Sequence, residues 1–344
     1  MSKRFLLLLL LPALLLAGCG KDPGAPEPEP EGAPIEIMVI FAPGQLGDRG
    51  YADGIMESIN TLLATGDNSL DIRFMTPYDL ELGLESIKSW VATPSRPFSS
   101  GEYDRRLLVL TEPFMAGYIG IVADRLRPTD EVLLLKMEEE DIAQIAEQFS
   151  LGNRVHGLNI SARESVKKFC DFMKLGDMAS LYYSFPVLRL YPNDSYPYRD
   201  GVEETIAEEL GPETVMLVNL SDSEGWGIYS AGATQTVVEA AYDWASFLAL
   251  MAEQSGCPYA IVDLGSGNSG WDYYLMGKEA GVTLWTLMMD VKNSHGAFRF
   301  YVYRHFGPAF ESWVNDWMGK GTGEMDAQTS YTDSRWYEDN IILD

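Results

Sequence analysis

Short apolar runs alternate with amphipathic stretches along nearly the whole chain, and this alternation limits the possible folds more than any other feature of the sequence. The runs are continuous rather than alternately polar, which is typical of strands that are buried on both faces of a parallel sheet. The stretches between them carry apolar residues at helical spacing. The pattern therefore predicts an α/β fold with doubly wound parallel sheets.

The alternation forms two series, and each series is long enough for a lobe of its own. In the first series we expect strands at 35–41, 70–76, 105–111, 131–137 and 154–160, followed by helices near 51–64, 79–91, 114–126, 139–149 and 162–174. In the second series we expect strands at 178–185, 214–221, 259–265 and 282–290, and helices near 198–210, 232–255, 271–280 and 296–319. Two α/β lobes follow from this arrangement.

The boundaries of the two lobes come from the same pattern. The N-terminal lobe is expected over 34–160 and the C-terminal lobe over 161–295. The last long helical run, 296–319, is expected to cross back and complete the first lobe. Residues 320–344 mix polar and aromatic side chains and are expected to pack as an irregular C-terminal strap.

The N-terminus has the parts of a secretory signal. Lys3 and Arg4 are cationic, 5–16 is an apolar run with one proline, and 16–19 reads Leu-Ala-Gly-Cys. The apolar run is shorter than the roughly 20 residues that span a bilayer. Residues 16–19 resemble the bacterial lipobox, whose cysteine is lipidated after cleavage. We therefore predict a signal peptide over 1–18 followed by a lipid-anchored cysteine; the alternative is an ordinary cleaved signal with a chance cysteine.

The segment after Cys19 is rich in proline, glutamate and glycine and has no large apolar residue. Such a segment cannot offset its ordering entropy by burial, so residues 19–33 are predicted to form a disordered tether. Gly20 stands where an aspartate retains enterobacterial lipoproteins in the inner membrane. We expect a cell-envelope protein anchored to the lipid bilayer through acylated Cys19, in the outer membrane and facing the periplasm or the surface if the cell is Gram-negative.

The charge of the chain excludes one large class of partners. Without residues 1–18, which hold Lys3 and Arg4, 23 basic and 51 acidic residues remain, a net charge of −28. Affinity for nucleic acid comes largely from lysine and arginine that neutralise phosphates, so we expect no nucleic-acid partner. Cys170 and Cys257 either pair in an oxidising compartment or stay as buried free thiols, the interpretation that we prefer.

Candidate ligand-binding residues follow the predicted strands, because open α/β sheets bind ligands at the carboxyl ends of their strands. They are Gly44, Asp48 and Tyr51 after the first strand, Thr111 and Glu112 after the third, Asp222 and Trp226 after the seventh, Gly265 and Gly267 after the eighth, Asp290 after the ninth, and Arg304 on the last helix. Asp48 is also expected to cap the helix that begins near Tyr51. We expect Tyr51 and Trp226, on opposite lobes, to sandwich a flat or sugar ring. Asp290 is expected to accept two adjacent hydroxyls; the alternatives are core packing for the two rings and a solvated turn for Asp290.

Residues 265–270 read Gly-Ser-Gly-Asn-Ser-Gly, which fits the G-x-G-x-x-G pattern between a strand and a helix, and Asp290 follows at the end of the next strand. This is the dinucleotide fingerprint, so a dinucleotide-dependent enzyme is one hypothesis. The motif lies in the second series rather than in the first βαβ unit, however, and exported lipoproteins rarely meet NAD. We expect the glycine turn to approach a sugar or base instead, and we expect no cofactor.

Motifs of hydrolytic or metal chemistry are missing from the sequence. It has no H-E-x-x-H, no C-x-x-C and no complete G-x-S-x-G. His156 lies on a predicted strand, His295 in a predicted loop and His305 on a predicted helix surface, and none has a second ligand at metal-binding spacing. We therefore expect neither an enzyme nor a metal site.

The stretch after the first strand, 42–52, reads Ala-Pro-Gly-Gln-Leu-Gly-Asp-Arg-Gly-Tyr-Ala. It resembles the signature of the basic membrane protein family of bacterial lipoproteins (the PnrA-like, Med-like group), approximately Asp-x-Gly-x-x-x-Asp-Lys-Ser-Phe-Asn. The glycine, the second aspartate and the aromatic residue match, whereas Ala42 and Ala52 replace the first aspartate and the ligand-contacting asparagine. Farther along, 265–270 resembles the glycine turn of the family, and 282–290 resembles its strand that ends in a ribose-binding aspartate.

The resemblance implies a type I periplasmic binding protein fold, in which two lobes are joined by a hinge, and the function of a solute-binding protein of an ABC transporter, several of which bind purine nucleosides. By this resemblance Asp290 stands at the ribose-binding aspartate, Arg304 at a lysine of the family and Trp226 at its second stacking ring. The implied partners are a small-molecule ligand, a nucleoside or similar polar ring compound, and an ABC permease. Because Ala42 and Ala52 replace two family residues, an envelope lipoprotein that uses this scaffold for sensing or protein interaction stays open as the alternative.

Overall fold

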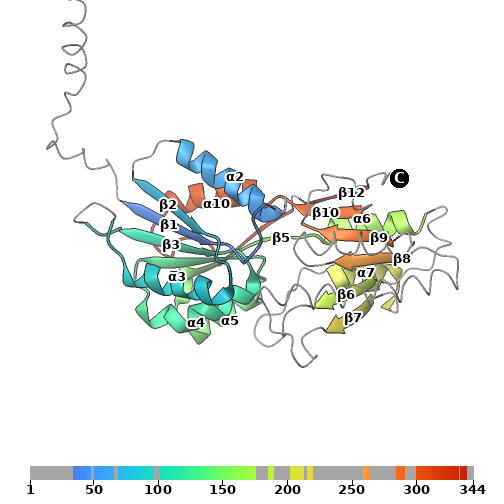
Figure 1. Cartoon of the computed structure of the whole chain (residues 1–344), viewed down its shortest axis with the longest axis horizontal. Helices are drawn as coiled ribbons and strands as arrows, with labels where there is room; N and C mark the ends of the chain where they lie inside the picture. The colour runs from blue at the N-terminus through green and yellow to red at the C-terminus, as the bar shows by residue number, and fades with distance from the viewer. Residues whose placement is uncertain are drawn as a thin grey trace, which may run out of the picture.

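The computed structural model describes residues 34–47, 50–65, 69–96, 101–175, 185–189, 202–212, 215–219, 259–263, 284–290, 300–332 and 334–338. Within these ranges helices and strands form two lobes, each with a largely parallel sheet (Figure 1). The predicted α/β class with doubly wound parallel sheets is confirmed. No helix in the same ranges is long and apolar enough to cross a membrane.

The first lobe is built on a six-stranded sheet with the order β11-β5-β4-β3-β1-β2. Every neighbouring pair in this sheet is parallel. The strands are β1 (Ile35–Ile40), β2 (Leu70–Met75), β3 (Arg105–Leu110), β4 (Asp130–Leu135), β5 (Val155–Ile160) and β11 (Gln328–Tyr331). Their carboxyl ends therefore meet at one edge of the lobe.

Helices cover both faces of this sheet. They are α2 (Tyr51–Ala64) and α10 (Phe306–Met318) on one face, and α3 (Leu80–Ala92), α4 (Ile119–Val122) and α5 (Glu139–Gln148) on the other. In β1, Ile37 and Val39 pack with α2 and α10, whereas Met38 and Ile40 pack with the helices of the opposite face. Both sides of the strand are buried in apolar cores, which is why the strand has a continuous apolar sequence.

The second lobe contains a four-stranded sheet with the order β12-β10-β9-β8, and a parallel pair of strands, β6 and β7, of which β6 lies beside β8. The strands are β6 (Phe185–Arg189), β7 (Val215–Asn219), β8 (Tyr259–Asp263), β9 (Leu284–Met289), β10 (Phe300–Arg304) and β12 (Ser334–Glu338). β12 runs antiparallel to β10. Helices α6 (Arg163–Met173) and α7 (Val202–Leu210) pack against each other. The helices expected at 232–255 and 271–280 lie outside the described residues.

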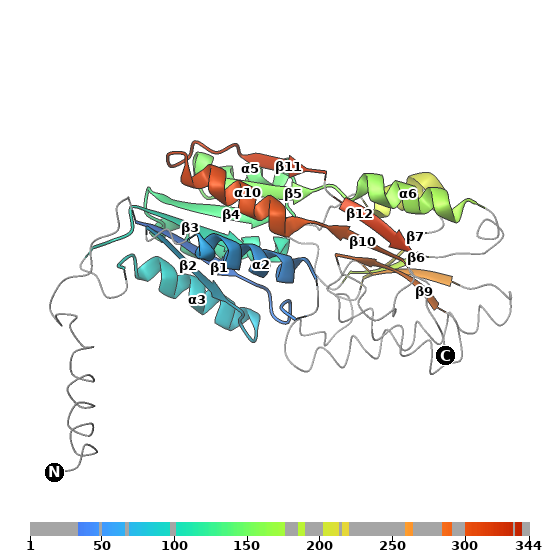
Figure 2. The same ribbon diagram turned by 90° about the horizontal axis from the view of Figure 1, so that it is seen from above.

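The chain crosses between the lobes three times, from β5 into α6, from β10 into α10 and from β11 into β12. Figure 2 shows α10 and β11 in the first lobe and β10 and β12 in the second. The first and third crossings are bound to each other, because the Ser161 amide donates to the Tyr331 carbonyl at 3.2 Å and Ser334 Oγ donates to the Ser161 carbonyl at 2.9 Å. Hinge bending between two lobes is absorbed at connections of this kind.

The expected helix at 296–319 is wrong at its start. Residues Phe300–Arg304 form β10, and the helix begins only at Phe306. Aromatic and β-branched side chains at 300–303 favour a strand. Arg304 therefore ends a strand instead of lying on a helix, which changes the direction in which its side chain is presented.

Three further expectations of secondary structure are corrected. The described part of 320–344 is not irregular, because it contributes β11 to the six-stranded sheet and β12 to the four-stranded sheet. The helix expected at 114–126 is divided into α4 between two short 3₁₀ helices, Pro113–Tyr118 and Ala123–Arg125, because Gly117 and Gly120 weaken a continuous helix. Of the strand expected at 178–185, only Phe185 is described, as the first residue of β6. The second residue of β6 is Pro186, although proline usually interrupts a strand.

Cys170 on α6 is a buried free thiol whose burial raises its pKa to about 12. Cys257 lies outside the described residues, as does His295. His156 is buried on β5, in agreement with its position on a predicted strand. His305 does not lie on the helix surface but at the residue that precedes α10.

Candidate functional site

The hydroxyl of Tyr51 is the centre of a polar cluster at the carboxyl ends of β1, β3 and β4. Tyr51 is the first residue of α2, and Gly50 rather than Asp48 occupies the N-cap position. The hydroxyl oxygen lies 2.7 Å from Glu112 Oε1 and 2.8 Å from the Thr111 carbonyl oxygen. Burial, together with the nearby Glu112 carboxylate, raises the pKa of Tyr51 well above its ordinary value, so the group remains a hydrogen-bond donor.

Gln45 connects the turn after β1 to this cluster. Its Oε1 accepts from the Ala42 amide at 2.9 Å and from Thr111 Oγ1 at 2.8 Å. Its Nε2 donates to the Tyr51 hydroxyl at 2.7 Å and to Glu112 Oε1 at 2.5 Å. Gly44, with a φ of 76°, allows the tight turn that brings this side chain inward.

Lys136 brings a cation into the cluster from the end of β4. Its backbone lies in the left-handed region, with a φ of 62°, and its amide donates to the Leu158 carbonyl at 2.9 Å. The ammonium nitrogen lies 3.2 Å from Glu112 Oε1 and 3.7 Å from the centroid of the Tyr51 ring. It also lies 3.5 Å from Oδ2 of Asp290, which belongs to the second lobe, so the ammonium joins the two lobes.

Asp290 and Arg304 form a bidentate pair at the carboxyl ends of β9 and β10. Arg304 Nε donates to Asp290 Oδ1 at 2.8 Å, and Nη2 donates to Oδ2 at 2.5 Å. Burial opposes ionisation of Asp290, but Arg304 and then Lys136 outweigh it and hold the pKa of this carboxyl below its ordinary value. The Arg304 guanidinium also lies 5.3 Å from the Phe306 ring, which in turn is 5.3 Å from the Tyr51 ring.

The cluster thus brings together residues that are distant in the sequence. Five of the residues expected at the site meet in it, namely Tyr51, Thr111, Glu112, Asp290 and Arg304. Gly44 shapes the turn beside it. The others, Asp48, Asp222, Trp226, Gly265, Gly267 and the lipidation candidate Cys19, lie outside the described residues, as does the glycine run 265–270. Gln45 and Lys136 were not expected.

The environment of two residues differs from what the sequence suggested. The Tyr51 ring faces the Lys136 ammonium and the Phe306 ring, so a stacked ligand ring would have to displace or share these contacts. Both oxygens of Asp290 accept from Arg304, so a pair of ligand hydroxyls would share this carboxylate with the guanidinium. Within the described ranges, no group of three His, Cys, Asp or Glu side chains is arranged to hold a metal ion.

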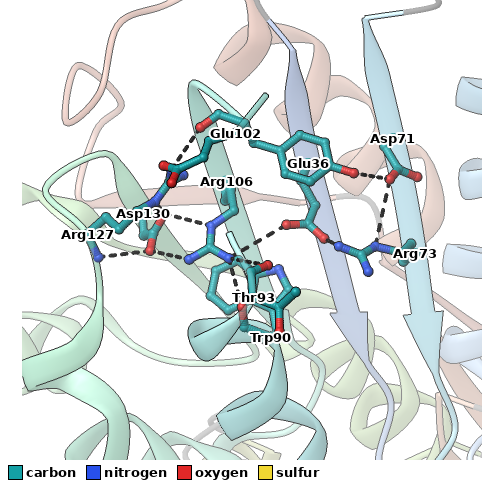
Figure 3. Close-up of polar contacts among 10 residues, drawn as sticks. Glu36, Asp71, Arg73, Trp90, Thr93, Glu102, Arg106, Arg127 and Asp130 are labelled. Carbon is teal, nitrogen blue, oxygen red and sulfur yellow. Dashed lines mark hydrogen bonds and ion pairs between the residues drawn. The ribbon is translucent and has the colours of Figure 1, made fainter. Parts of the chain in front are cut away.

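A second charged cluster lies at the opposite, amino ends of the strands of the first lobe (Figure 3). The Arg106 guanidinium pairs with both oxygens of Asp130, at 2.9 and 2.6 Å, and donates to the Trp90 carbonyl at 2.8 Å. It stacks 4.2 Å from the Trp90 ring, and Glu36 pairs with Arg73 beside it. Arg106, Asp130 and Glu36 are fully buried, and the two carboxylates are compensated by Arg106 together with Arg73 and Arg127, so this cluster is structural.

Two α/β lobes linked by three crossings, with a polar cluster between the tips of their strands, have the architecture of a type I periplasmic binding protein. Solved structures with this fold match most of the chain. An ABC transporter solute-binding protein from Burkholderia multivorans has a TM-score of 0.58 and 12% identity, over 89% of this chain and 99% of that one. A solute-binding protein from Agrobacterium vitis with bound allitol has a TM-score of 0.57 and 10% identity, over 89% and 96%. One from Aeropyrum pernix K1 has a TM-score of 0.53 and 16% identity, over 90% and 78%.

These likenesses establish the fold. No protein-family model and no curated protein sequence matches the chain. The resemblance to the basic membrane protein family therefore stays a prediction, whereas the type I periplasmic binding protein fold that it implied is confirmed.

Proposed function

We propose that this protein is a membrane-anchored, extracytoplasmic solute-binding protein that captures a small polar molecule between its two lobes for an ABC transporter. The observation that carries the proposal is the cluster of Tyr51, Glu112, Lys136, Asp290 and Arg304, which takes side chains from the strand ends of both lobes. Ligands of open α/β sheets bind at this position. Solved neighbours of the same fold carry allitol, L-arabinofuranose or 5-methylthioribose, which supports a ligand rich in hydroxyl groups.

The chemistry of the cluster suits a neutral polar ring compound, such as a sugar or a nucleoside. Glu112 and Asp290 supply acceptors for hydroxyl groups, and Lys136 and Arg304 supply donors. Their formal charges cancel, so a neutral ligand leaves no buried charge without compensation. Closure of the lobes about the three crossings would complete the site. A ligand that binds the closed form more tightly would shift the population toward that form.

The anchoring part of the proposal rests on the N-terminal sequence. An acylated Cys19 would hold the protein on the bilayer, and the tether 19–33 would let the lobes stand away from it and reach a permease. We propose no catalytic role and no cofactor.

One observation favours a second function. Each charged group of the cluster already has an opposite partner inside the protein, so the cluster does not need a ligand to balance its charges. An envelope lipoprotein that uses the same scaffold for sensing or protein interaction would show this feature too. Binding measurements separate the two functions.

The test is thermal melting of the purified protein with sugars, polyols, nucleosides and amino acids. A ligand present at 100 times its dissociation constant stabilises the native state by about 2.7 kcal/mol, which raises the melting temperature measurably. Asp290→Asn and Glu112→Gln should lose the response, whereas Glu85→Gln, at an exposed site on α3, should keep it. Unchanged melting across the whole panel would argue for the sensing or interaction role.

A further inference from the structure

The ammonium of Lys136 lies in a cage that is formed by two carboxylates and one aromatic ring. Its Nζ is 3.2 Å from Glu112 Oε1, 3.5 Å from Asp290 Oδ2 and 3.7 Å from the Tyr51 ring centroid. An aromatic face and carboxylates are the groups with which proteins recognise amines. Lys136 and Asp290 are each only 6% exposed at the side chain, and Glu112 is 12% exposed, so water screens these interactions weakly.

The backbone fixes the lysine in this position. Lys136 adopts a left-handed conformation that residues other than glycine rarely take, and such conformations persist only where the surrounding structure holds them. Its amide hydrogen bond to the Leu158 carbonyl on β5 provides this support. The stem of the side chain is thereby directed from the end of β4 toward the Tyr51 ring.

The charges of the cluster balance only when Lys136 is present. Asp290 has its bidentate partner Arg304, whereas among the described residues the cation that Glu112 contacts is Lys136. Removal of the lysine therefore leaves one buried carboxylate without compensation, which is costly in a poorly solvated site. An amine-bearing ligand would compete with Lys136 for these carboxylates and would leave an excess buried positive charge.

We infer that Tyr51, Glu112 and Asp290 form an alkylammonium site whose resident occupant is the Lys136 side chain, and that this side chain excludes amine-bearing molecules from the cluster. The exclusion of amines rests on the solute-binding role proposed above. The alkylammonium site itself does not, because it is defined by contacts within the chain.

Chemical rescue tests the site. Lys136→Ala removes three carbons and the ammonium group, which n-propylammonium replaces. We expect this variant to melt about 5 °C or more below the wild type. Millimolar n-propylammonium chloride should restore at least about half of that loss by binding the native state. n-Propanol with sodium chloride at the same ionic strength should restore none of it.

Two matched variants control the rescue. Lys136→Met fills the cage with an uncharged stem, and Lys174→Ala removes an exposed lysine that pairs with Glu209. Neither variant, nor the wild type, should respond to n-propylammonium. A rescue that propanol reproduces, or that all variants share, would overturn the alkylammonium site.

A second measurement needs no added amine and covers the case in which Lys136→Ala does not fold. Glu112→Gln should lower the melting temperature of the wild type but raise that of Lys136→Met, because it removes the uncompensated carboxylate. Additive losses in the double variant would overturn the inference. If the wild type binds amines from the solute panel as well as it binds neutral solutes, the exclusion role is wrong. If it binds no solute at all, the exclusion role and the proposed function both fail. The alkylammonium site is decided separately, by the rescue experiment and by the double variant.

Discussion

The indole Nε1 of Trp317 donates a hydrogen bond of 2.6 Å to Oε2 of Glu131, which joins α10 to the amino end of β4. The same carboxylate accepts from Arg105 at 2.8 Å and from the Gly323 amide at 2.7 Å, and it lies 3.2 Å from His156 Nε2. Burial raises the pKa of the Glu131 carboxyl, but these hydrogen bonds outweigh it and lower the pKa to about 2, from 4.5. The carboxylate therefore holds the returning C-terminal segment on the first lobe.

Folding stability should fall in acid because of Glu131. Its pKa is lower in the folded state, so its contribution of about 3 kcal/mol is fully present above about pH 4.5 and is lost as the pH falls toward about 2. Urea unfolding at pH 7 and at pH 2.5 measures this loss. Glu131→Gln should be less stable at pH 7 and should lose less than the wild type between the two pH values; Glu140→Gln, at an exposed site on α5, should follow the wild type.

Gly307→Ala should destabilise the first lobe by about 1–3 kcal/mol, because α2 and α10 touch through their glycines. A methyl group on Gly307 would overlap the carbonyl of Gly54, a backbone atom that cannot rotate away. Gly319→Ala, at the end of the same helix, meets only ordinary contacts and should change stability by less than about 0.5 kcal/mol. Equal effects of the two substitutions in urea unfolding would contradict this close approach.

Arg106→Ala should cost about 3–5 kcal/mol of folding free energy, because it leaves buried Asp130 and Glu36 without their shared cation. Arg106→Lys should restore only part of the loss, since lysine cannot reproduce the bidentate geometry. Guanidinium unfolding checks both. Arg125→Ala is the control, because Arg125 is 60% exposed, and it should be close to neutral.

Tyr51→Phe should cost about 1–2 kcal/mol, because it removes the hydroxyl that Gln45 and Glu112 contact but keeps the ring under Lys136. Any solute response in thermal melting should weaken with it. Tyr78→Phe, at a site that is 73% exposed, should change neither property. A Tyr51→Phe protein as stable as the wild type would mean that the hydroxyl makes no net contribution.

Cys19→Ser should release the protein from membranes. Two acyl chains on one residue hold a protein firmly to a bilayer, and the rest of the mature chain is strongly acidic. In a detergent-phase partitioning experiment, the wild type should enter the detergent phase and the variant should stay in the aqueous phase. Equal partitioning would favour the ordinary cleaved signal.

Much of the first lobe could be predicted from the sequence. The helix expected at 51–64 is Tyr51–Ala64, and the strands of the first series differ from expectation by a few residues at their ends. Apolar periodicity is a local property, so it locates such elements well. β11 could not be found in this way, because Gln328–Tyr331 is short and polar and owes its strand conformation to pairing with β5.

The candidate site was predicted in part, for a related reason. Strand-end reasoning found Tyr51, Glu112 and Asp290, which lie after apolar runs. Lys136 was missed because it fell inside the strand expected at 131–137, whereas β4 ends at Leu135. Gln45 lies in the same turn as Gly44, but its membership in the cluster is evident only from its hydrogen bonds in the folded protein.

The three crossings have a consequence for the order in which the protein can mature. α10 and β11 of the first lobe, and β12 of the second, all come from residues after 305. A polypeptide that is synthesised from its N-terminus therefore cannot finish its first lobe before the residues that form α10 and β11 have been made. Both lobes reach their native state together, late in synthesis, and the edge of β5 stays open until β11 pairs with it.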